Sequence, residues 1–104
     1  MELEKFMEIR EQFCLKYPEV TEGKMMSSPA IHYNKKVFAF FSRKQKMVFR
    51  FGKDYPLDKL TVEVSEFNPF KKKKPLAGWF EVDYKYHDNW ENLAHLALKT
   101  IQTL

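Results

Sequence analysis

The amino-acid sequence predicts a two-layer α+β fold, in which an amino-terminal helix and a carboxyl-terminal helix pack on one face of an antiparallel sheet of four to five strands. Changes of hydrophobic period support this prediction. Apolar residues recur every three or four positions near both ends of the chain, whereas the middle alternates with a period of two. The length of 104 residues is typical of one domain. We therefore expect a single domain over residues 1–104.

Both expected helices carry an apolar stripe. The first is predicted over residues 3–17, with Arg10 at the one missing position of a stripe that consists of Leu3, Phe6, Met7, Phe13, Cys14 and Tyr17. The second is predicted to begin near Asp88, which would cap it, with Glu91 completing a capping box. Its expected stripe consists of Trp90, Leu93, Ala94, Ala97, Ile101 and Leu104.

The segments between the helices are rich in β-branched and aromatic residues, which is typical of strands. We predict strands over 30–33, 37–42, 46–51 and 79–84. The first three should form an antiparallel meander, with Asn34-Lys35 as a tight turn. A further short strand is expected around 24–27. The segment 57–67 is compatible with either a short helix or irregular structure.

Two central strands are expected to differ in what their faces carry. The side chains of strand 46–51 alternate between two faces, which predicts a half-exposed strand. Met47, Phe49 and Phe51 are expected on one face, and Val48 and Arg50 on the other. Strand 37–41 is apolar on both faces. Phe38 and Phe40 are expected on one face, and Val37, Ala39 and Phe41 on the other. Its second face needs a cover, which is either loop 54–70 or a subunit interface or ligand groove.

Charge and cysteine content indicate a cytoplasmic protein. The formal net charge of +4 favours polyanionic partners. Cys14 is the single cysteine and suits a reducing compartment. The first five residues include acids where a secretory signal carries bases. The longest apolar run, residues 37–41, is much shorter than the ~20 residues of a membrane helix, so we expect no membrane association.

No residue pattern typical of catalysis or of metal binding is present. The histidines have neither metal-ligand spacing nor a cysteine pair beside them, and we expect surface or capping roles for His32, His87 and His95. The glycines stand alone and form no phosphate-binding loop; they are Gly23, Gly52 and Gly78. Ser27-Ser28 lacks the glycine-flanked turn of hydrolases. The sequence therefore predicts a protein that is not an enzyme and has no catalytic residues, metal or cofactor.

The most unusual segment is a run of four lysines between two prolines, Pro69 and Pro75. Pro75 favours an extended conformation before it, which predicts a loop. Bases also gather on the expected hairpin loop at 43–46. Together they form a candidate nucleic-acid-binding set, in which Phe70 could stack on a base: Arg43, Lys44, Lys46, Lys71, Lys72, Lys73 and Lys74. The alternative is that the run is an ordinary solvated loop.

Several of these segments resemble a known family. Gly23-Lys24-Met25-Met26, followed by a hairpin into residues 36–39, is similar to the opening of the TfoX amino-terminal domain family. The segments Phe67-Asn68-Pro69, Lys74-Pro75-Leu76 and 78–82 are similar to its carboxyl half and to MmcQ/YjbR-like proteins. The resemblance spans roughly residues 4–101.

This resemblance implies a compact helix–sheet–helix domain, some of whose relatives are linked to competence regulation or suspected of binding DNA. It implies no catalytic residues. The sequence departs from the TfoX pattern at Ser27-Ser28, where the family has a glycine pair, and at Asn34-Lys35, where glycine usually follows Asp or Asn. TfoX regulators also carry a second, helical domain that has no counterpart in these residues.

Three hypotheses about function remain open at this point. The first is a non-enzymatic binding domain, acting on nucleic acid through its basic loops, in a regulatory role. The second is a protein-interaction or self-association module, such as a homodimer, that uses the second face of strand 37–41. The third is a small-ligand-binding domain or an enzyme without a familiar motif.

Overall fold

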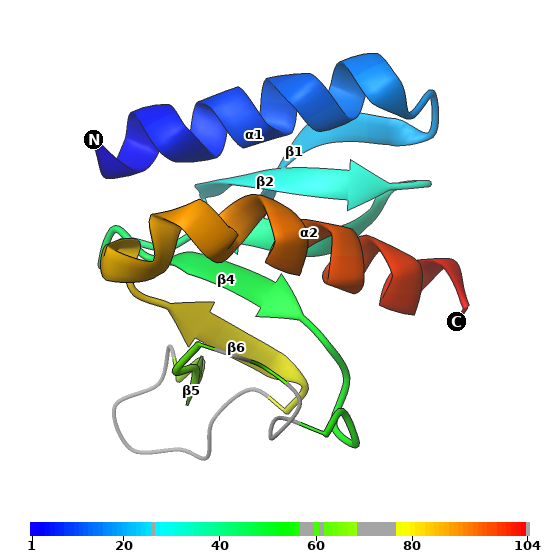
Figure 1. Cartoon of the computed structure of the whole chain (residues 1–104). Helices are drawn as coiled ribbons and strands as arrows, with labels where there is room; N and C mark the ends of the chain where they lie inside the picture. The colour runs from blue at the N-terminus through cyan, green and yellow to red at the C-terminus, as the bar shows by residue number, and fades with distance from the viewer. Residues whose placement is uncertain (26, 57–59, 61, 69–76, 104) are drawn as a thin grey trace.

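The computed structural model describes residues 1–25, 27–56, 60, 62–68 and 77–103. Two helices lie on one face of an antiparallel sheet (Figure 1), as the sequence predicts. They are α1 (Glu2–Lys16) and α2 (His87–Gln102). In the described residues the sheet has six strands instead of four to five. The α+β fold class is therefore confirmed, and the sheet is slightly larger than expected.

The strands follow one another across the sheet except at its last edge. Their bounds are β1 (Val20–Met25), β2 (Ser28–Tyr33), β3 (Lys36–Phe41), β4 (Met47–Arg50), β5 (Ser65–Glu66) and β6 (Trp79–Val82). Their order is β1-β2-β3-β4-β6-β5. The predicted meander is confirmed, and its turn at Asn34 and Lys35 has positive φ at both residues, 48° and 70°. This is the backbone that a two-residue hairpin of type I′ requires.

The strands at the two edges differ from the prediction. The strand expected around 24–27 is β1, which begins earlier, at Val20, and ends at Met25, and all six of its residues pair with β2. The undecided segment 57–67 contains β5 in its described part, where Ser65 pairs with Glu81 of β6. The expected strand 79–84 ends at Val82, because the 3₁₀ helix η2 (Tyr84–Tyr86) follows it.

The first helix presents a narrower stripe to the core than expected. Its buried residues are Phe6, Ile9, Arg10 and Phe13, at the i, i+3, i+4, i+7 spacing of one helix face. Leu3 and Met7, which the prediction placed in the stripe, are 46% and 41% exposed. Ile9, which the predicted stripe left out, is buried instead.

The predicted capping box of the second helix is wrong. α2 begins at His87, and Asp88 lies within its first turn without capping it. The chain enters α2 directly from η2, whose own cap is Asp83: its Oδ1 accepts a hydrogen bond from Lys85 N at 3.0 Å. The predicted buried stripe is confirmed through Ile101, with Leu98 added, while Leu104 lies outside the described residues.

A β-bulge changes the faces of β3. Ile31 pairs with Ala39 but the next residue, His32, pairs with Val37, so Phe38 is an extra residue in the strand. An extra residue shifts the alternation of side chains by one position. Phe38 therefore joins Ala39 in the core under the helices, whereas Phe40 belongs to the cluster on the other face. The strict alternation predicted for strand 37–41 is wrong for this reason.

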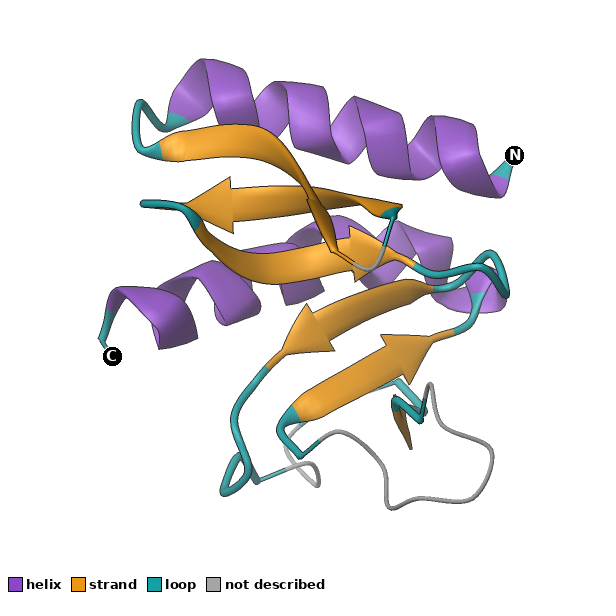
Figure 2. Ribbon diagram, turned by 180° about the vertical axis from the view of Figure 1, so that it is seen from behind, coloured by secondary structure: helices purple, strands orange, loops and turns teal. Residues whose placement is uncertain are grey.

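The second face of the sheet, seen in Figure 2, carries its own apolar cluster. Its buried members are Ala30, Phe40, Val48 and Phe67, with Met25, Val37 and Trp79 packed against them. The ring centroid of Phe40 is 5.1 Å from that of Phe67 and 5.6 Å from that of Trp79. In the described part of loop 54–70, Phe67 supplies the cover of this face, although Ala39 and Phe41, which were expected on it, lie in the core under the helices. The prediction of a half-exposed 46–51 strand is wrong, since Val48 is fully buried.

We predict that Trp90→Ala lowers the free energy of unfolding by about 3–5 kcal/mol. Trp90 is fully buried in the core between α2 and the sheet, and its Nε1 donates to Asp83 O at 3.3 Å. Denaturant melts measure the loss. Glu91→Ala, at the exposed neighbouring position, should change it by less than about 0.5 kcal/mol. A loss below ~1 kcal/mol at Trp90 would contradict this packing.

We also predict that Phe67→Ala costs about 3 kcal/mol, because Phe67 covers Phe40 on the second face of the sheet. The exposed aromatic face should then promote self-association, which sedimentation velocity detects. Glu66→Ala is the matched control, since Glu66 is the exposed residue beside it. Equal stability of the two variants would show that Phe67 is not the cover.

Candidate functional site

The hairpin turn between β3 and β4 holds three of the predicted basic residues. Arg43 and Lys44 are exposed at its tip. The turn is well bonded, because Ser42 N donates to Lys46 O at 2.9 Å and Gln45 N donates to Ser42 O at 2.9 Å. Arg43 and Lys44 are therefore cations held on a short, fixed turn.

The side chain of Lys46, the third basic residue of this turn, lies near two carboxylates. Its Nζ lies 4.0 Å from Glu81 Oε1 and 3.8 Å from Asp83 Oδ2, both near the end of β6. These two carboxylates balance its charge, so Lys46 is a weaker candidate for a phosphate contact than its neighbours in the turn.

The four predicted lysines of the run, Lys71 to Lys74, lie outside the described residues. The nearest described residues on either side are Asn68 and Ala77. Phe67 N donates to Trp79 O at 2.8 Å, which places the described segment that ends at Asn68 beside the start of β6. The hairpin turn lies at the other end, since Met47 pairs with Val82 and Arg50 with Trp79. The described ends of the two basic segments are therefore separated by about 10 Å of paired strand.

Different residues surround the described start of β6. The guanidinium carbon of Arg50 lies 5.8 Å from the ring centroid of Trp79, which is half-buried. Exposed Lys53 follows in the next loop. Acids are also present here, because Asp54 follows Lys53 and exposed Glu66 precedes Phe67. Arg50 was not among the residues predicted to bind nucleic acid, although the alternation of its strand placed it on the outer face.

A close approach of two loops holds these residues together. Phe51 N and Gly52 N both donate to Gly78 O, at 3.0 and 3.1 Å. Gly78 has a φ of 86°, and a Cβ there would lie 3.1 Å from Gly52 Cα. Glycine at this position therefore lets the loop after β4 meet the chain just before β6.

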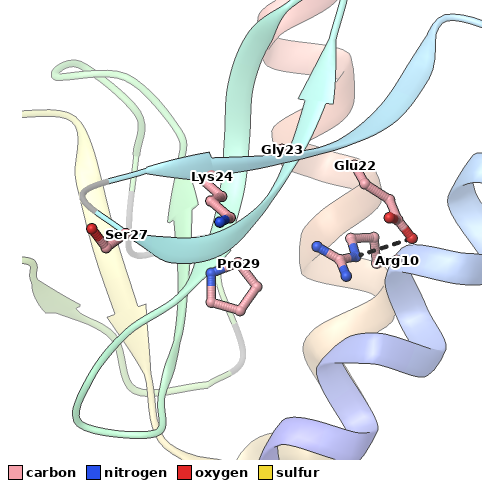
Figure 3. Close-up of a pocket in the computed structure, with 6 residues that line it drawn as sticks. All are labelled: Arg10, Glu22, Gly23, Lys24, Ser27 and Pro29. Atoms are coloured by element: carbon pink, nitrogen blue, oxygen red, sulfur yellow. Dashed lines mark ion pairs between the residues drawn. The ribbon is translucent and has the colours of Figure 1, made fainter.

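A pocket lies elsewhere, between α1 and the hairpin of β1 and β2 (Figure 3). It has a volume of about 440 Å³ and is lined by Arg10, Glu22, Gly23, Lys24, Ser27 and Pro29. No sequence pattern predicted this pocket. One signal was visible, since Arg10 interrupts the apolar stripe of the first helix and is nonetheless buried.

His95 joins the two helices and is not the surface residue that the sequence suggested. Its Nδ1 lies 3.3 Å from Tyr17 Oη, and its ring centroid is 4.5 Å from that of Phe13. Burial lowers the pKa of His95, and nearby Lys16 lowers it further. The neutral imidazole is therefore the form that fits between α1 and α2.

Cys14 has the environment of a structural residue. It packs against the core, and burial raises the pKa of its thiol, with the charge of Glu22 adding to the shift. In the described part of the chain, no group of three or more His, Cys, Asp or Glu could hold a metal ion. A search of the same residues finds no helix with the length and apolar character to cross a membrane.

Comparisons with protein-family models, with curated proteins and with solved structures find no match for this chain. The resemblance to the TfoX amino-terminal domain therefore stays a prediction.

We predict that the protein loses stability as the pH falls below about 6.5, the unfolded-state pKa of histidine, because the lowered folded-state pKa of His95 resists protonation. The contribution is fully present above that pH and is lost below it. Denaturant melts from pH 7.5 to 5 measure the slope, which His95→Gln should flatten. Lys16→Gln removes a charge that lowers this pKa and should make the slope shallower. Identical slopes in all three proteins would contradict the assignment to His95.

Proposed function

We propose that this chain is a non-enzymatic binding domain that binds nucleic acid through Lys71 to Lys74 and through Arg50, Lys53 and Trp79, which lie at one end of the sheet. The observation that supports the proposal is the stack of Arg50 on half-exposed Trp79, beside the described residues that flank the run. In line with the family resemblance, we place this role in a cytoplasmic regulatory protein.

The chemistry of these side chains suits a single-stranded nucleic acid. Lysine and arginine neutralise phosphates and release counterions, which supplies sequence-independent affinity. An aromatic ring that carries an arginine on one side offers a surface for base stacking. Asp54 and Glu66 reduce the positive charge of this region, so the four lysines of the run decide its sign.

The hairpin cations take a secondary part in this proposal. Arg43 and Lys44 are exposed and lie at the far end of β4, within reach of a strand of a few nucleotides. Lys46 is excluded from the contact set because Glu81 and Asp83 already balance it.

Self-association through the second face of β3 is the alternative that has less support. Phe40 on that face is only 1% exposed, because Phe67 and Trp79 pack against it. A partner would meet the edges of this cluster and not its centre.

We predict that replacing Lys71 to Lys74 by Ala flattens the dependence of single-stranded DNA affinity on salt. With two to four lysines engaged, the slope of log affinity against log salt should fall by about 1.4–2.8 units, at ~0.7 per phosphate. Fluorescence anisotropy of labelled oligonucleotides, titrated at salt concentrations from about 50 to about 300 mM, measures this slope. We expect stability to change little, since four adjacent like charges contribute no apolar packing.

The matched control replaces four scattered lysines, Lys5, Lys16, Lys85 and Lys99, by Ala, which changes the net charge equally. Tryptophan fluorescence adds a second readout: Trp90 is fully buried, so quenching by an oligonucleotide reports on Trp79. Equal slopes in the two quadruple variants, without quenching, would reduce the run to a solvated loop.

A further inference from the structure

The pocket under the β1–β2 hairpin contains a cation that is mostly withdrawn from water. The side chain of Arg10 is 11% exposed, although it reaches from α1 into the pocket (Figure 3). A buried charge is costly unless other groups compensate it. The contacts of Arg10 therefore decide what this site can do.

The contacts of Arg10 hold the guanidinium in place without neutralising it. Nη1 donates to Ala30 O at 3.4 Å, Nη2 lies 3.2 Å from Met7 Sδ, and the guanidinium carbon is 5.6 Å from the ring centroid of Phe6. A carbonyl oxygen, a thioether and an aromatic face are neutral partners. They orient the planar group but leave its full positive charge in the pocket.

The one carboxylate paired with Arg10 in the described residues is a weak counterion. Glu22 Oε1 lies 3.8 Å from Arg10 Nε, beyond the length of a good hydrogen bond, and the side chain of Glu22 is 68% exposed. Such an exposed partner can rotate into water at little cost. Together these contacts engage at most three of the five guanidinium N–H groups.

A second cation and a neutral wall complete the pocket. Lys24 extends from β1 toward Pro29, on the same side of the hairpin as Arg10 (Figure 3). Gly23 has no side chain and contributes only backbone to the lining. A Cβ at this position would meet the ring of His32 on the opposite face of the hairpin. The lining thus combines two cations, one displaceable acid and the ring of Pro29.

We propose that this pocket binds a small organic anion through its carboxylate or phosphate group. Arg10 grips the oxyanion with its planar donors, Lys24 supplies a second positive charge, and Glu22 rotates outward when the ligand enters. The volume of about 440 Å³ accommodates an anion that carries a ring or short chain against Pro29. This site is separate from the proposed nucleic-acid surface and lies on the helix side of the sheet.

The test uses the whole chain labelled with ¹⁵N and two probes, benzoate and phenyl phosphate, which share a ring and differ in the oxyanion. Amide shifts of Glu22, Gly23, Lys24 and Ser27 and the side-chain Nε–H of Arg10 follow the titration, with sodium chloride at matched ionic strength as reference. We expect saturable shifts with at least one probe, and the comparison of the two identifies the preferred oxyanion. Absence of saturation with both, or equal shifts with chloride, overturns the proposal.

Two pairs of variants test the assigned roles. Arg10→Met keeps the length of the side chain and should weaken binding by at least about tenfold, whereas exposed Arg43→Met changes the net charge equally and should leave it within about twofold. Glu22→Gln removes the competing carboxylate and should tighten binding by about fivefold, while Glu19→Gln should not. If Arg10→Met fails to fold, the glutamate pair decides. Equal affinities of the two glutamate variants overturn the proposal.

Discussion

The arrangement of this protein depends on the packing of Phe40 between Phe67 and Trp79. The sheet is covered by helices on only one face, and its central strand carries large apolar side chains on both (Figures 1 and 2). The ring of Phe67, 5.1 Å from Phe40, covers the other face from the position directly after β5, a strand of only two residues. Without that contact, a fully buried side chain such as Val48 would face water.

The same region of the structure holds the described residues nearest the lysine run. Phe67 N bonds to Trp79 O, and Gly78 O accepts from the loop after β4, so both chain segments that lead to the lysine run are fastened at one end of β6. The bases of the β3–β4 turn lie at the opposite end. The described positive charges at the same end of β6 as these segments are Arg50 and Lys53, and the packing of the second face, rather than the charges themselves, decides this grouping.

On the helix side of the sheet, a cation, Arg10, interrupts the apolar stripe of α1. Phe6, Ile9 and Phe13 anchor α1 to the sheet, and the helix period then carries Arg10 into the pocket below the β1–β2 hairpin. A buried arginine with an exposed partner contributes little to stability, since desolvation opposes the attraction. The pocket and the proposed nucleic-acid surface rest on separate packing contacts, so substitutions can test them independently.

The periodicity of the sequence predicted the two helices, the meander and the need for a cover on the second face, because hydrophobic period and turn residues act locally. It did not predict the bulge at Phe38, the start of α2 or the burial of Ile9 in place of Met7.

Those features depend on contacts between residues far apart in the chain, which no local pattern records. The sequence by itself determined which residues are apolar, which are charged and where the helices and most of the strands form. Only the tertiary structure decided that Arg50 meets Trp79, that Lys46 is balanced by Glu81 and Asp83, and that Arg10 lies in a pocket. The physical reason is that strand register and helix docking bring distant side chains together, and both are set by the packing of the whole core.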